Sequence, residues 1–130
     1  MKDTFNFYVR AVGESGPYNK PAWAGRQSEF VATIVIKLAH VTETGNPYYR
    51  VGVCVKNHKD KLPFIKKEGR QIAFDRATNC PPVFNLNDVW HLVVTGLSQQ
   101  KNRKIADLVD FRNLDHRIRK VLFLYTQPKA

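Results

Sequence analysis

The side chains best suited to chemistry in this chain are the basic residues gathered between positions 56 and 70. That stretch holds six basic residues against two acidic ones. The six are Lys56, Lys59, Lys61, Lys66, Lys67 and Arg70. Ammonium and guanidinium groups bind phosphate and carboxylate oxygens. The stretch therefore predicts a surface for anions rather than a catalytic centre.

Motifs for cofactor chemistry are absent from the sequence. No glycine-rich loop ends in Gly-Lys-Ser or Gly-Lys-Thr, and no GxGxxG follows a strand pattern. The four histidines, at positions 40, 58, 91 and 116, are widely scattered, and Cys80 has no second cysteine two residues on. Because zinc sites need clustered ligands, we expect no metal and no cofactor.

Two enzymatic interpretations stay open at this stage. Asp60 and Glu68, with His58, would serve a metal-dependent nuclease, although their spacing matches no carboxylate pattern. Cys54 and His58 would form a nucleophile and its base. The residues around Cys54 are apolar, and a buried thiol behaves as a small hydrophobic side chain. We therefore predict a protein without enzymatic activity and keep the nuclease as an alternative.

Net charge is the outstanding bulk property of the chain. It carries 21 Lys and Arg against 11 Asp and Glu, a net charge of +10 with an isoelectric point near 9.9. Residues 1–40 contribute +2, and residues 41–78 and 79–130 contribute +4 each. Such a charge attracts polyanions. The expected partners are nucleic acid or an acidic face of another protein.

The remaining composition indicates one compact domain spanning residues 1–130. Two cysteines are too few for a disulfide framework. The first residues lack the apolar segment of a signal peptide, and no run approaches the roughly 18 apolar residues that span a bilayer. We expect a reduced, cytoplasmic protein with no membrane contact.

The first half of the chain has the pattern of an antiparallel sheet. Residues 4–12 alternate as a half-buried strand, and residues 28–56 predict a hairpin that turns at 43–46. The inward side of the first strand holds Phe5, Phe7, Val9 and Ala11. The inward side of the returning strand holds Tyr49, Val51, Val53 and Val55.

Helices are expected in the second half. A helix over 62–77 begins near Asp60 as its N-cap, with Pro63 in its first turn. Its apolar stripe holds Leu62, Ile65, Gly69, Ile72 and Ala73. Residues 88–98 favour a helix over a strand, residues 101–114 continue a helical stripe, and residues 116–125 predict a closing strand. The fold class is therefore α+β, a small antiparallel sheet packed with two or three helices.

The outward face of the predicted sheet combines basic and aromatic side chains. Strand alternation places there Tyr8, Arg10, Lys37, Tyr48, Arg50 and Lys56. Basic groups bind phosphates, and tyrosine rings stack on unpaired bases. This combination favours single-stranded nucleic acid over duplex, provided that no helix covers the face. Near the C-terminus, Arg117 and Arg119 would share one face of the closing strand.

A sequence pattern between residues 49 and 77 adds context. A strand is followed by Lys-Asp, a Phe, a Lys-Lys-x-Gly-Arg and an Ala-x-x-Arg. These are Lys59-Asp60, Phe64, Lys66-Lys67, Gly69-Arg70, Ala73 and Arg76. The pattern resembles one in small uncharacterised bacteriophage proteins. That resemblance implies an accessory protein made in a bacterial cytoplasm, a class that often binds nucleic acid or disables host machinery such as defence complexes, and it implies no catalytic residue.

The sequence therefore predicts a non-enzymatic basic protein that binds nucleic acid, with single-stranded DNA or RNA favoured. The residues expected to bind are Tyr48, Arg50, Lys56, Lys59, Lys61, Lys66, Lys67, Arg70, Arg117 and Arg119. One alternative is a phage-encoded inhibitor that docks on a host protein or nucleoprotein complex, with Trp23 or Trp90 as an aromatic anchor. The metal-dependent nuclease is the second alternative.

Overall fold

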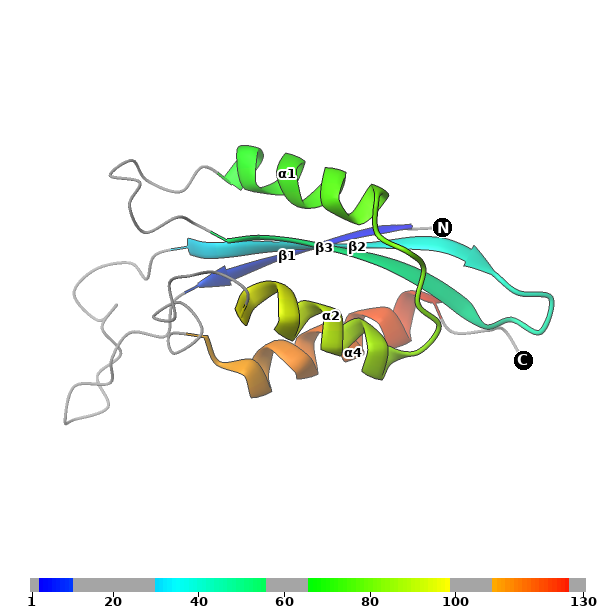
Figure 1. The fold of residues 1–130 in the computed structure, drawn as a ribbon. Coiled ribbons are helices and arrows are strands. Elements are labelled where there is room, and N and C mark those ends of the chain that lie inside the picture. Colours follow the sequence, from blue (N-terminus) through cyan, green and yellow to red (C-terminus); the bar gives the residue numbers. More distant parts are fainter. Residues whose placement is uncertain (1–2, 11–29, 56–65, 99–108, 127–130) are drawn as a thin grey trace.

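A three-stranded antiparallel sheet with helices on both faces forms the fold (Figure 1). The computed structural model describes residues 3–10, 30–55, 66–98 and 109–126. The strands, in spatial order, are β1 (Thr4–Arg10), β2 (Phe30–Val41) and β3 (Pro47–Val55). The described helices are α1 (Lys66–Thr78), α2 (Leu86–Ser98) and α4 (Phe111–Thr126). The predicted α+β class is confirmed.

The β2–β3 hairpin turns where the sequence predicts. Gly45 has a φ of 86°, a conformation that glycine adopts without a steric penalty. The Thr42 N–H donates to the Asn46 carbonyl over 2.9 Å, and the Gly45 N–H donates to the Thr42 carbonyl over 2.9 Å. This turn fixes the register in which Ile36 faces Val51 and Ile34 faces Val53.

The main core lies between the sheet and the two helices α2 and α4. Strand alternation buries the side chains predicted to face inward, among the described residues Phe5, Phe7, Val9, Tyr49, Val51, Val53 and Val55. Helix α2 adds Val89, Val93 and Leu97, which are at most 1% exposed. Their i, i+4 spacing confirms the helix predicted at 88–98.

The closing strand predicted at 116–125 is wrong, because these residues belong to helix α4. Leu114, Ile118 and Leu122 follow one another at i, i+4 spacing, and all three are at most 2% exposed in the core. The helix has a clear start, since the Asp110 carboxylate accepts a hydrogen bond from the Asn113 N–H over 3.1 Å. An aspartate in this position satisfies a backbone donor that the helix itself leaves unpaired.

A second, smaller core forms where α1 covers the other face of the sheet. Val35 and Cys54 of the sheet pack against Ala73 and Ala77 of α1. The buried stripe of α1 is therefore Gly69, Ala73 and Ala77. Ile72, which the sequence placed in the stripe, is 43% exposed. The predicted helix start near Asp60 lies outside the described residues.

The open sheet face predicted from the sequence is therefore wrong, because α1 lies on it. Gly52 allows this close approach. A Cβ atom at Gly52 would overlap the Ala73 carbonyl oxygen and the Ala77 backbone nitrogen. Because Gly52 has no side chain, it leaves space on β3. The small side chains of Ala73 and Ala77 allow the α1 backbone to occupy that space.

We expect Gly52→Ala to destabilise the protein by about 3 kcal/mol or more, at the upper end of overpacking effects. The new methyl group would meet α1 backbone atoms, which cannot move aside as a flexible side chain does. Urea unfolding measures the change. As a control, Ile72→Ala on the exposed side of α1 should change the free energy of unfolding by only about 0.5 kcal/mol. Equal stability of Gly52→Ala and the wild type would contradict the close approach.

Candidate nucleic-acid interface

The basic side chains predicted on the open sheet face are engaged with α1 and the residues after it. The Lys37 ammonium lies 4.2 Å from the centre of the Phe74 ring and donates to the Thr78 hydroxyl over 3.1 Å. The Arg50 guanidinium donates to the Cys80 carbonyl over 2.5 Å. These two cations hold the α1 layer on the sheet, so the structure gives Arg50 a packing role.

The tyrosines of the same face are also in contact with neighbours. The Tyr8 hydroxyl accepts a hydrogen bond from Arg70 over 3.4 Å. The Tyr48 ring stacks on His40 with the ring centres 4.5 Å apart and meets Phe84 at 5.4 Å. Tyr48 therefore belongs to an aromatic cluster at the hairpin end, where two other rings already contact it.

The basic patch of residues 56–70 is described only at its C-terminal end. Lys56, Lys59 and Lys61 lie outside the described residues. Lys66 begins α1, and the side chains of Lys67 and Arg70 are exposed on that helix. Lys67 therefore remains available to an anion, whereas Arg70 is exposed but reaches back to Tyr8 of β1.

Arg117 and Arg119 do not share a face, contrary to the prediction. In a helix, residues two apart point about 200° away from each other. Arg119 forms an ion pair with Asp115, with its Nε 2.6 Å from the carboxylate, and donates to the Asn87 side chain over 2.8 Å. Arg117 is exposed. The ion pair largely cancels the charge of Arg119.

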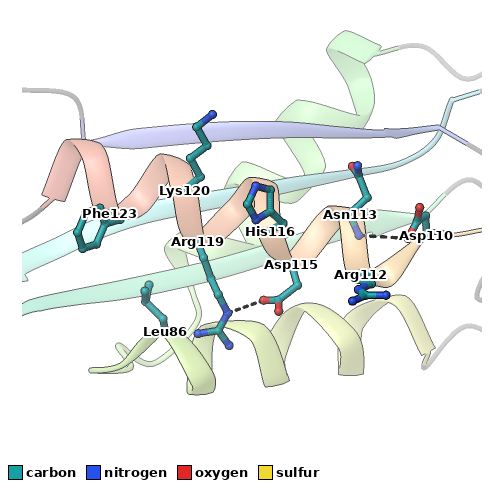
Figure 2. Close-up of a pocket in the computed structure, with 9 residues that line it drawn as sticks. All are labelled: Leu86, Asp110, Arg112, Asn113, Asp115, His116, Arg119, Lys120 and Phe123. Atoms are coloured by element: carbon teal, nitrogen blue, oxygen red, sulfur yellow. Dashed lines mark hydrogen bonds and ion pairs between the residues drawn. The ribbon is translucent and has the colours of Figure 1, made fainter.

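A shallow cavity runs along the outward side of α4, and we call it the α4 groove (Figure 2). Its volume is about 750 Å³. Its lining residues are Leu86, Asp110, Arg112, Asn113, Asp115, His116, Arg119, Lys120 and Phe123. Figure 2 shows Arg119 and Asp115 reaching toward α2, while Lys120 points away from it.

The α4 groove is lined by two arginines, one lysine and one histidine against two aspartates, Asp110 and Asp115. Helix α4 holds four basic residues and one acidic residue, Asp115. Asp115 forms an ion pair with Arg119. Arg112, His116 and Lys120 follow one another at i, i+4 spacing and are exposed. Within the part of the chain that the structure describes, these three side chains form no ion pair. The groove therefore exposes two cations, Arg112 and Lys120, beside the carboxylate of Asp110.

An aromatic ring completes one end of the α4 groove. The Phe123 side chain is 57% exposed and lines the cavity with Leu86 of α2. Arg112, His116, Arg119 and Phe123 follow helical spacing, a signal that is present in the sequence. Because residues 116–125 were predicted to form a strand, this helical spacing was not used. Only Arg119 of these four residues was therefore among the predicted binding residues.

The nucleophile considered at Cys54, against the predicted absence of catalysis, would lie where a thiolate is disfavoured. Burial raises the pKa of the Cys54 thiol, and the nearby positive charge of Arg76 lowers it by a smaller amount. A higher pKa leaves less thiolate, the reactive form. Its proposed base His58 lies outside the described residues, as does Asp60 of the nuclease alternative. Glu68 is an exposed residue of α1, and the described residues contain no cluster of three or more potential metal ligands.

Comparisons with known proteins do not place the chain in a family. No family model, curated protein or solved structure matches it. None of the described helices is long and apolar enough to cross a membrane.

The two cysteines should differ in their reaction with iodoacetamide at pH 8. Cys80 is half-buried, whereas Cys54 is 8% exposed with a raised pKa. We expect alkylation of Cys54 in the native protein to be slower by roughly tenfold or more, because both access and the thiolate fraction are reduced. Peptide mass spectrometry follows each site, and the two rates should converge in urea. Faster reaction at Cys54 would contradict its placement under α1.

Proposed function

We propose that the protein binds single-stranded nucleic acid through the α4 groove and has no enzymatic activity of its own. The observation that carries this proposal is the combination of Arg112, His116 and Lys120, without ion-pair partners in the described chain, with the exposed ring of Phe123 in one cavity. Cationic groups track a phosphate backbone, and aromatic rings stack on unpaired bases.

The shape of the groove favours a single strand over a duplex. Proteins that read the major groove insert a helix that projects from their surface. Here the basic side of α4 lies in a hollow beside α2, and Arg119 ties the two helices together through Asn87. A flexible strand can follow such a hollow and place an unpaired base against Phe123, whereas the bases of a duplex are already stacked on one another.

The resemblance of residues 49–77 to small bacteriophage proteins supplies a context for this activity. An accessory protein made in an infected bacterial cytoplasm meets abundant single-stranded DNA and RNA. The net charge of +10 favours encounter with either polymer, since a field of one sign steers the opposite charge.

A second candidate function is docking on a host protein as an inhibitor. Phe123 and Leu124 are adjacent near the C-terminal end of α4, and each is at least 57% exposed. Exposed apolar patches often mark protein interaction sites. The anchors predicted from the sequence do not carry this candidate, because Trp90 is half-buried against Phe111 with the ring centres 6.1 Å apart, and Trp23 lies outside the described residues.

The double variant Arg112→Ala/Lys120→Ala should weaken binding of labelled single-stranded DNA and RNA. Each lost phosphate contact should reduce the log–log slope of affinity against salt by roughly 0.7. Fluorescence anisotropy over a salt series measures both the affinity and the slope.

The matched control for that experiment is Lys67→Ala/Arg70→Ala. It removes one lysine and one arginine from the exposed side of α1, so the net charge changes equally. We expect a smaller loss of affinity than from the α4 variant. Equal losses of affinity in the two variants would show that the net positive charge of the protein, and not the α4 groove, attracts the nucleic acid. Unchanged affinity in the α4 variant would overturn the proposal.

Phe123→Ala should weaken binding of single strands by about 1–3 kcal/mol, the usual contribution of one stacked base. Binding to duplex of the same length should change little, because its bases are already stacked. Leu124→Ala is the control, since Leu124 is 63% exposed but lies outside the groove lining. An equal loss on duplex and single strand would rule out stacking on Phe123.

A further inference from the structure

Within the ranges that the structure describes, one edge of strand β3 has no neighbouring strand over most of its length. Strand β3 is the outer strand of the order β1-β2-β3. At Tyr49 the N–H donates to the Val83 carbonyl and the carbonyl accepts from the Val83 N–H, both over 2.8 Å. Backbone groups alternate in direction along a strand. Val51 and Val53 therefore point their N–H and C=O groups the same way as Tyr49, away from β2.

Among the described residues, the backbone of the chain pairs with this edge only at Tyr49. After Val83 it turns into α2, which begins at Leu86. The Val53 carbonyl accepts a hydrogen bond from the Arg76 guanidinium over 2.7 Å. In the described part of the chain, the N–H groups of Val51 and Val53 and the Val51 carbonyl have no partner on this side. Unpaired backbone groups at a sheet edge are a template for an added strand.

These backbone groups open onto a second cavity, of about 470 Å³, which we call the β3-edge groove. Its lining residues are Val51, Gly52, Val53, Arg76, Leu92, Thr95 and Gly96. Helix α1 supplies one wall and α2 the other, on opposite faces of the sheet (Figure 1). Gly96 lets α2 sit tightly on β3, because a Cβ atom there would lie 2.8 Å from the Val53 side chain. The edge is therefore recessed between two helices.

We propose that the β3-edge groove binds an extended acidic peptide segment of a partner protein as an added strand. Pairing with Val51 and Val53 supplies backbone hydrogen bonds, the usual source of affinity when a peptide extends a sheet. The positive charge of Arg76 would favour acidic side chains in the bound peptide. The Arg76 side chain is exposed, and one of its N–H groups donates to the Val53 carbonyl. Its other guanidinium N–H groups would donate to a carboxylate on the added strand.

The recessed edge excludes a second copy of this chain as the occupant. Paired strands lie about 4.8 Å apart. A second β3 edge would bring its own α1 and α2 walls to the same depth, and the four helices would collide first. A single extended peptide has no such walls. The β3-edge groove shares no residue with the α4 groove, so the two sites are independent.

The test uses an equimolar library of blocked pentapeptides Glu-X-Thr-X-Asp, where X is Val, Ile, Tyr or Phe. Protein labelled with ¹⁵N is titrated with the library and followed by amide chemical shifts and hydrogen exchange. We expect the largest shifts and slower exchange at the amides of Val51 and Val53. A Gln-X-Thr-X-Asn library should bind at least about tenfold more weakly, because it lacks the charge-assisted contact to Arg76.

Two variants separate this site from a general charge effect. Arg76→Gln retains an amide donor for the Val53 carbonyl and should weaken binding of the acidic library at least about tenfold. Thr95→Arg places a long side chain in the groove and should abolish binding by the neutral and the acidic libraries alike. Lys67→Ala, outside the groove, should bind as the wild type does. Thermal unfolding checks that each variant is folded.

Three results would overturn the proposal. One is the absence of shifts at Val51 and Val53 with the library at about 1 mM, the weak limit of useful peptide affinity. Another is a shift of the same amides that depends on protein concentration without peptide, which would assign the edge to a second copy. The last is displacement of the peptides by single-stranded DNA in the Arg112→Ala/Lys120→Ala variant, which would assign this edge to nucleic acid.

Discussion

The contact between the α1 backbone and Gly52 determines much of this structure. Because Gly52 has no side chain, α1 lies directly on β3, and Ala73 and Ala77 form a small core with Val35 and Cys54. Any larger residue at Gly52 would lift the helix away. Helix α1 therefore covers β2 and β3 on the face opposite α2 and α4, which limits where a binding surface can lie.

The two layers around the sheet differ in how they are held. On the side of α2 and α4, large apolar side chains such as Ile34, Tyr49 and Ile118 fill the space. On the side of α1 the apolar contact is small, and polar contacts surround it. Lys37 reaches over Phe74 and Arg50 reaches the Cys80 carbonyl. Basic residues that resemble a binding surface in the sequence thus attach a helix to the sheet.

Local patterns in the sequence were sufficient for some elements and not for others. The alternation of Phe5, Phe7 and Val9 and the turn at Gly45 predict the sheet correctly, because each signal depends on near neighbours. The burial of the outward face could not be predicted, since a glycine in a strand does not reveal which helix will approach it. The region 116–125 was assigned wrongly because its apolar run, ending in Phe123, Leu124 and Tyr125, satisfies a strand pattern. Its helical stripe is spread over nine residues from Leu114 to Leu122.

The net charge of the chain is therefore a poor measure of its binding residues. Cations at Lys37, Arg50 and Arg119 are engaged within the fold, whereas Arg112 and Lys120 face the α4 groove. The same positive field would attract the proposed ligands of both grooves, but the two sites would hold them differently. The proposed phosphate contacts along α4 would release counterions and would weaken steeply with salt. Backbone pairing at β3 involves neutral groups, so added salt should screen only the contribution of Arg76. Salt dependence thus distinguishes a polymer bound by its charge from a strand bound by its backbone.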